Sequence, residues 1–225
     1  MEIHLTPDQV RIIGALIEKE ITTPDLYPLS LNALTNACNQ KSSRDPVLSL
    51  GEEEVQETVD DLVKLRLVME DSGFGSRVVK YRQRFCNSEF SVVKLSPSEA
   101  ALICVLFLRG AQTAGELRGR CSRLYQFKDL DEVETTLQEL SARADGPFVA
   151  RLQREPGKRE IRYRHLFGSE PVADDSVESF PEKSASEWGD KGRLDRLEHQ
   201  VEDLSQTVES LKNQIDRLVS LSRPD

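Results

Sequence analysis

The pattern of hydrophobic and polar residues repeats itself once along the chain. Residues 5–16 read LTPDQVRIIGAL, and residues 95–108 read LSPSEAALICVLFL. In each copy a Thr or Ser precedes a Pro and is followed, three positions after the hydroxyl, by Gln or Glu. This is a capping box with proline at the first helical position. Apolar residues then recur at helical spacing, so each copy predicts a core helix and the chain reads as a duplicated module.

The first module predicts three helices followed by a β-hairpin. The helices are expected at residues 7–20, 31–39 and 52–65. Residues 22–30 hold two prolines and predict a loop, and residues 39–51 are polar and predict a second loop of unusual length. The apolar runs at residues 67–69 and 78–81 flank the turn sequence DSGFGS, which is typical of a hairpin.

The second module repeats this order. Its helices are expected at residues 96–108, 113–125 and 131–142, and its hairpin at residues 148–154 and 160–165, joined through a Pro-Gly pair that suits a type II turn. Three helices and a hairpin in this order are typical of a winged helix. The predicted fold class is therefore mainly α with small β-hairpins (α+β), in two tandem winged-helix domains at residues 1–88 and 89–167. Residues 85–94 are expected to form either a linker or a buried bridge.

The C-terminal part changes character. Residues 168–190 are rich in Ser, Pro and acids and predict a disordered acidic linker. Residues 191–222 then carry strict heptads, which predict a coiled-coil helix; β-branched residues at three of four a positions with Leu at every d position favour a parallel dimer of two copies of this chain. The alternative is a helix that folds back on the modules. The expected dimerisation residues are Leu194, Leu197, Val201, Leu204, Val208, Leu211, Ile215 and Leu218.

Composition narrows the class of protein. The chain is 38% hydrophobic and 31% charged, and its longest apolar run, residues 100–108, is too short to span a bilayer. No signal-peptide pattern begins it, so we expect a cytoplasmic protein that does not associate with membranes. Its three histidines are mutually remote and no CxxC pair occurs, so we expect reduced, mostly buried thiols and neither a metal nor another cofactor. The thiols belong to Cys38, Cys86, Cys104 and Cys121.

Several longer strings carry a resemblance to a known family. They are TTPDLYPLSLNALTNACNQK (22–41), SGFGSRVVKYRQRFCNSEF (72–90), LRGAQTAGELRGR (108–120), DGPFV (145–149) and REPGKRE (154–160). In these strings the chain closely resembles the YceH-like family of uncharacterised bacterial proteins, over roughly residues 5–167. The resemblance implies a pair of tandem winged-helix domains and no particular activity, and beyond Gly168 it is one of style only.

The sequence contains no enzyme signature. There is no phosphate-binding Walker A spacing, no zinc-binding HExxH motif and no GxSxG nucleophile elbow. Gly73-Phe74-Gly75 is an isolated GxG that turn formation explains. We therefore expect a protein that is not an enzyme.

Charge is distributed unevenly. Residues 89–167 hold thirteen Lys or Arg against eleven Asp or Glu, whereas the whole chain has a formal net charge of −9. The predicted third helices are acidic, which opposes insertion into a DNA groove because carboxylates repel phosphates. The wings and the middle helix of the second module are basic instead. The candidate nucleic-acid contacts are Arg77, Lys80, Arg82, Arg84, Arg118, Arg120, Arg123, Lys158, Arg159, Arg162 and Arg164.

Two functions remain open at this point. We favour a dimeric DNA-binding regulator that contacts the phosphate backbone through its basic wings. The alternative is an adaptor that binds an unidentified protein partner without touching DNA, similar to the acidic tandem winged-helix subunits of condensin-type complexes. A solvated strand edge whose charges pair with the acidic helices would also explain the basic wings.

Overall fold

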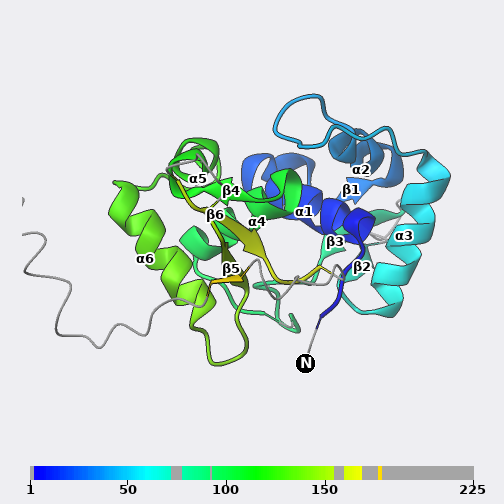
Figure 1. Cartoon of the computed structure of the whole chain (residues 1–225). Helices are drawn as coiled ribbons and strands as arrows, with labels where there is room; N and C mark the ends of the chain where they lie inside the picture. Colours follow the sequence, from blue (N-terminus) through cyan, green and yellow to red (C-terminus); the bar gives the residue numbers. More distant parts are fainter. Residues whose placement is uncertain (1–2, 72–77, 92, 155–159, 169–176, 179–225) are drawn as a thin grey trace, which may run out of the picture. The chain divides into compact units, whose positions relative to one another are not determined.

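A computed structural model describes residues 3–71, 78–91, 93–154, 160–168 and 177–178 (Figure 1). Residues 1–180 form one compact unit. In the described part the chain is a mixed α+β protein with six α-helices and small antiparallel sheets. The predicted coiled coil lies outside the described residues, as do both hairpin turns and most of the predicted acidic linker.

The first half runs helix, strand, helix, helix, strand, strand. Its elements are α1 (Pro7–Thr22), the 3-10 helix η1 (Pro24–Leu26), β1 (Leu29–Ser30), α2 (Leu31–Cys38), α3 (Glu52–Lys64), β2 (Val68–Asp71) and β3 (Lys80–Gln83). The strands form an antiparallel sheet in the order β1-β3-β2. The prediction of a loop at residues 22–30 was therefore wrong in part, because this segment contains a short helix and a strand.

The second half repeats the order and adds one strand. Its elements are α4 (Pro97–Arg109), β4 (Gln112–Thr113), α5 (Ala114–Arg120), α6 (Leu130–Ser141), β5 (Val149–Leu152), β6 (Arg162–His165) and β7 (Val177–Glu178). The strands form an antiparallel sheet in the order β4-β6-β5-β7. The helix expected at 113–125 ends earlier, at Arg120, and turns follow it.

The capping boxes predicted from the sequence are present. Thr6 and Gln9 exchange hydrogen bonds at the start of α1, and Ser96 and Glu99 do so at the start of α4. These local bonds satisfy backbone groups that a helix leaves unpaired at its first turn. They explain why both helices begin where the sequence alone places them.

The two halves share one hydrophobic core, in which α1 packs along α4 (Figure 1). Every residue of α4 from Glu99 to Leu108 is buried, as expected for a helix that is apolar on all sides. Gly14 lies at the contact, where an added Cβ would come within 3.0 Å of Leu108 Cδ2 and Phe107 Cβ. The absence of a side chain at this position allows the two helices to approach closely.

The segment between the two halves, residues 85–94, is anchored by the buried side chains of Phe85, Cys86 and Val93, although Glu89, Phe90 and Lys94 are exposed. Phe85 is completely buried, and its ring centroid lies 5.4 Å from that of Phe107 and 5.1 Å from that of Phe167. The backbone N–H of Leu5 donates to the carbonyl of Phe167 at 2.8 Å, which ties the N-terminal segment to the end of β6. These contacts join the two halves through their cores.

The long polar loop at residues 39–51 is also anchored. Asn39 pairs with the backbone N–H and carbonyl of Leu50, which closes the loop at its base. Asp45 donates its backbone N–H to the carbonyl of Leu108 at 3.0 Å, so the loop reaches the end of α4. Within the loop, the side chain of Arg44 is buried. The loop is therefore a structural connection between the two halves.

Candidate nucleic-acid interface

The acidic character predicted for the third helix of each half is visible at the surface. On α3 the outward carboxylates are exposed: Glu53, Glu54, Glu57, Asp60 and Asp61. On α6, Asp131, Glu134 and Glu139 are exposed, while Glu132 accepts hydrogen bonds from the Tyr125 hydroxyl and the Lys128 backbone N–H. Both helices therefore present negative charge to any phosphate that approaches them.

The basic residues of the first hairpin are largely occupied. Arg82 forms an ion pair with Asp71 on the adjacent strand. The Arg84 guanidinium lies over the ring of Phe90, 5.4 Å from its centroid. Lys80 is exposed, and Arg77 lies outside the described residues. Among the described cations of this hairpin, Arg82 is thus the one whose charge a carboxylate balances, while Lys80 and Arg84 keep theirs.

The second half is different, because several of its arginines gather where α4, α5 and β6 meet the first half. We define the arginine cluster as Arg109, Arg120, Arg123 and Arg162. Arg109, Arg120 and Arg123 line one small hollow together with Glu18 and Ser43. Arg162 is held by the Ala111 carbonyl at 2.7 Å. The N-terminal capping of α5 sets the position of Glu116, which reaches Arg120 and Arg162.

Two carboxylates serve four guanidiniums in this region. Glu116 lies 3.3 Å from both Arg120 and Arg162, and Glu18 contacts the buried Arg44 at 2.6 Å and Arg123 at 3.5 Å. With Arg109, and with Asp45 whose charge acts on Arg109, the region holds five guanidinium groups and three carboxylates, so positive charge exceeds negative charge.

Arg109 also lies close enough to the other arginines to be affected by their charge. Burial, followed by the nearby charge of Arg120, lowers the pKa of Arg109 from its ordinary value. Arg123 remains well exposed, with 65% of its side chain accessible. This combination of excess positive charge and accessibility suits contact with a polyanion.

The other candidate residues are dispersed. Arg118 is exposed and donates to the Lys128 carbonyl at 3.2 Å. Arg164 lies in β6 and lines a separate cavity. Lys158 and Arg159, at the turn of the second hairpin, lie outside the described residues. The structure thus gathers Arg120, Arg123 and Arg162, and it places Arg118 and Arg164 elsewhere.

Three charged residues that matter for this region were not singled out by the sequence. Arg11 and Glu18 lie on α1 and are 4% exposed, and Arg44 is 5% exposed. The available signal was a pair of opposite charges seven residues apart at the two ends of an apolar run, residues 12–17, which places both on one helix face. The position of Arg44 in a polar loop gave no such signal, because only the folded chain brings it to Glu18.

The thiols are placed as the sequence predicts. Cys38, Cys86, Cys104 and Cys121 are all buried and free. Burial raises the pKa of Cys38, Cys86 and Cys121 to about 12, and that of Cys104 well above its ordinary value. Across the described ranges, no cluster of three or more His, Cys, Asp or Glu side chains could hold a metal ion. Among the helices that the structure describes, none is long and apolar enough to cross a membrane.

Comparison with known proteins identifies the family. Residues 5–158 match the model described as "Protein of unknown function, DUF480". The UPF0502 protein YceH of Escherichia fergusonii is 54% identical over 212 residues, which cover 94% of this chain and 97% of that protein. The chain belongs to the DUF480 family. A UPF0502 protein of Shewanella halifaxensis is 56% identical over 216 residues, covering 96% of this chain and 99% of that protein. This confirms the resemblance drawn from the sequence, and none of these names states an activity.

Proposed function

We propose that each half of this DUF480 protein is a winged-helix domain and that the protein is a DNA-binding regulator. The order helix, strand, helix, helix, strand, strand in each half supports the first part of the proposal. So do the sheet orders, in which the first short strand pairs with the last strand of the hairpin. We propose a binding role and no catalytic one.

DNA is contacted through its phosphate backbone by the arginine cluster of the second half. The observation that carries this proposal is that Glu116 is shared by Arg120 and Arg162, and that Glu18 is shared by Arg123 and the buried Arg44. A phosphate that approaches the cluster therefore meets more guanidinium groups than carboxylates. Phosphate contacts of this kind fix the position of a protein on DNA without reading its sequence.

This mode differs from groove insertion by a third helix. The exposed carboxylates of α3 and α6 would face the phosphates on both sides of a groove, and each would weaken binding. In the first hairpin Asp71 balances the charge of Arg82, which leaves Lys80 and Arg84 as its remaining described cations. We therefore centre the proposed surface on the arginine cluster of the second half, and pairing of two chains through the predicted coiled coil would present it twice.

A mobility-shift assay with mixed genomic fragments tests the proposal. Affinity should fall steeply between about 50 mM and about 200 mM salt, with a log–log slope of about 0.9 per phosphate contact. Replacing Arg109 and Arg123 together by Gln should reduce that slope by about 2. The control is Arg82→Gln, which removes a matched charge and should leave binding nearly unchanged. No binding at low salt, or equal effects of the two variants, would refute it.

The second candidate is the adaptor function, and the exposed acidic face of α3 favours it. Six exposed carboxylates on one helix, the five named above and Glu52, suit a basic protein surface better than DNA. In this case charge-reversed α3 variants, such as Glu57→Lys with Asp61→Lys, would abolish capture of one specific partner in a pull-down. Arg109→Gln with Arg123→Gln would not affect that capture. If the protein binds DNA, the arginine variants should therefore weaken its activity in the assay; if it is an adaptor, the α3 variants should.

A further inference from the structure

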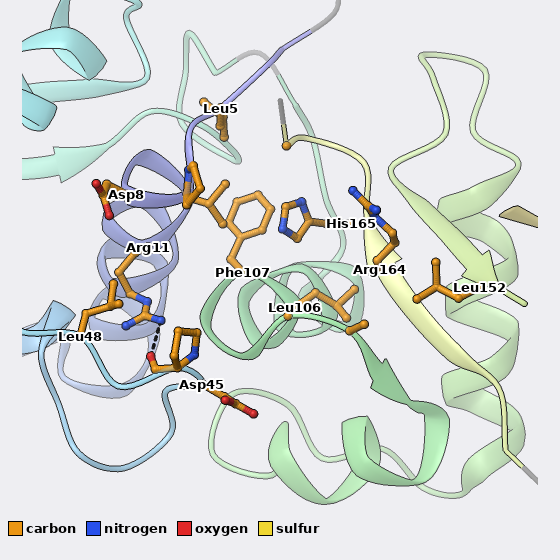
Figure 2. Close-up of a pocket in the computed structure, with 16 residues that line it drawn as sticks. Leu5, Asp8, Arg11, Asp45, Leu48, Leu106, Phe107, Leu152, Arg164 and His165 are labelled. Carbon is orange, nitrogen blue, oxygen red and sulfur yellow. Dashed lines mark hydrogen bonds between the residues drawn. The ribbon is translucent and has the colours of Figure 1, made fainter. Parts of the chain in front are cut away.

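A cavity of about 450 Å³ lies between the two halves of the compact unit (Figure 2). Residues of α1 and the 39–51 loop line one side, α4 lines the floor, and β6 lines the other side. Leu106, Phe107 and Leu152 supply apolar surface. A volume of this size is typical of sites for small organic molecules.

His165 provides a polar group on the β6 side. Its ring packs edge-on against Phe107, with centroids 4.8 Å apart, and its Nδ1 is sealed from solvent without a hydrogen-bond partner. Burial and then the charge of Arg164 lower its pKa to about 4, so the imidazole is neutral at pH 7. A buried acceptor without a partner is more easily tolerated than a buried donor. The proton therefore belongs on Nε2, which is left to donate into the cavity.

Arg11 provides a fixed positive charge on the α1 side. Its Nη1 donates to the Cys38 carbonyl at 3.1 Å and its Nη2 to the Pro46 carbonyl at 2.7 Å. Both acceptors are uncharged, and the Nε atom is buried without a partner. Asp8 and Asp45 also line the cavity, but both are exposed, and in Figure 2 their carboxylates point away from its centre.

Arg164 is the second cation of the cavity wall. Within the described part of the chain it forms no ion pair, unlike Arg162 two residues earlier on the same strand. Figure 2 shows its side chain extending toward His165. A positive charge and a neutral N–H donor thus lie together beside an apolar floor. This combination suits one acidic group attached to an apolar body.

We propose that this cavity binds a small organic monoanion. The acidic group lies against Arg164 and His165, and the apolar body packs on Phe107, Leu106 and Leu152. The exposed carboxylates of Asp8 and Asp45 at the edge disfavour ligands with several negative charges, such as nucleoside triphosphates. The proposed ligand contacts lie on α4, β5 and β6 of the second half, and α1 with Arg11 forms the facing wall of the cavity. This inference does not depend on DNA binding.

The probe for a first test is 1-anilinonaphthalene-8-sulfonate, an organic monoanion that fluoresces when bound in apolar surroundings. Titration of the full chain at pH 7.5 should saturate at one probe per chain. Arg164→Gln should weaken binding about tenfold or more, because a charge-assisted hydrogen bond is lost. N-phenyl-1-naphthylamine, the same molecule without the sulfonate, should bind more weakly and be affected less than about twofold by Arg164→Gln.

Three variants complete the design. Arg154→Gln removes an exposed charge of the same half outside the cavity and should change nothing. Leu152→Trp fills the cavity and should block both probes, which provides a second measurement if Arg164→Gln is unstable. The competing hypothesis is that the acidic segment after Gly168 occupies the cavity. In that case the wild type would not bind the probe, whereas a triple variant with Glu170→Gln, Asp174→Asn and Asp175→Asn would bind it. That result, or equal binding of the anion by Arg164→Gln and the wild type, would overturn the proposal.

Discussion

Replacing Arg44 by methionine tests the buried network that joins the 39–51 loop to α1. The Arg44 side chain is 0% exposed and that of Glu18 is 5% exposed. The guanidinium donates to the Ala37 carbonyl through Nε at 3.0 Å and through Nη2 at 2.7 Å, and to the Ser43 carbonyl through Nη1 at 2.9 Å. Its Nη2 also lies 2.6 Å from Glu18 Oε2. Methionine replaces the aliphatic part of the arginine side chain, is shorter, and can make none of these bonds.

The expected loss of stability comes from the partners of Arg44 that the substitution leaves unpaired. Glu18 would remain buried with only the longer contact to Arg123, at 3.5 Å, and the Ala37 carbonyl would lose its two donors. Breaking a buried ion pair by removing one partner costs about 3–5 kcal/mol. For a compact unit of this size each kcal/mol lowers the melting temperature by about 2–4 °C. Arg44→Met should therefore melt roughly 6–20 °C below the wild type.

Thermal melting, which measures the temperature shift, and urea unfolding, which measures the loss of free energy, are the assays, both monitored by circular dichroism. The urea midpoint should fall while the m value stays constant, which indicates a loss of stability without a change in the surface exposed. Lys64→Met is the matched control, since Lys64 pairs with Asp61 at 2.8 Å but both side chains are more than half exposed. Such surface pairs contribute about 0–1 kcal/mol. A loss below about 1 kcal/mol for Arg44→Met, equal to that of the control, would show that the burial argument is wrong.

Three further predictions concern packing, pH and thiol chemistry. Gly14→Ala should destabilise the protein, because its Cβ would press on Leu108 and Phe107. Gly119→Ala has open space around its Cβ and should stabilise the protein by up to ~1 kcal/mol. Thermal melting should therefore show a lower melting temperature for Gly14→Ala and a higher one for Gly119→Ala. His165 has a folded-state pKa of about 4, below its unfolded value of about 6.5, so its stabilising effect is complete above pH 6.5 and is lost as the pH falls toward 4. Urea unfolding should show a loss of ~2 kcal/mol from this group between pH 7 and pH 5, and His165→Gln should remove that part of the slope; an unchanged slope would contradict it. The buried cysteines, with raised pKa values, should resist iodoacetamide at pH 8 in the native protein and all react in urea, as counted by mass spectrometry; rapid alkylation of the folded chain would argue against their burial.

The sequence by itself determined the helices and their order, because the signals involved are local. The capping boxes at Thr6 and Ser96 act within four residues, and the helical spacing of apolar residues needs no distant partner. The sequence also determined that the third helices are acidic and that the thiols are buried. The two-residue strands β1 and β4 were not predicted from the sequence, because their partners on β3 and β6 lie about fifty residues away.

Only the tertiary structure decided which charges are balanced. The sequence treats Arg82 and Arg162 alike, but folding gives Arg82 a carboxylate of its own and makes Arg162 share Glu116 with Arg120. It also brings Arg44 to Glu18 across twenty-six positions and so anchors the polar loop to α1. The physical reason is that an ion pair depends on the distance between side chains in space, and strand pairing (β2 with β3, β4 with β6) and the anchored 39–51 loop set those distances.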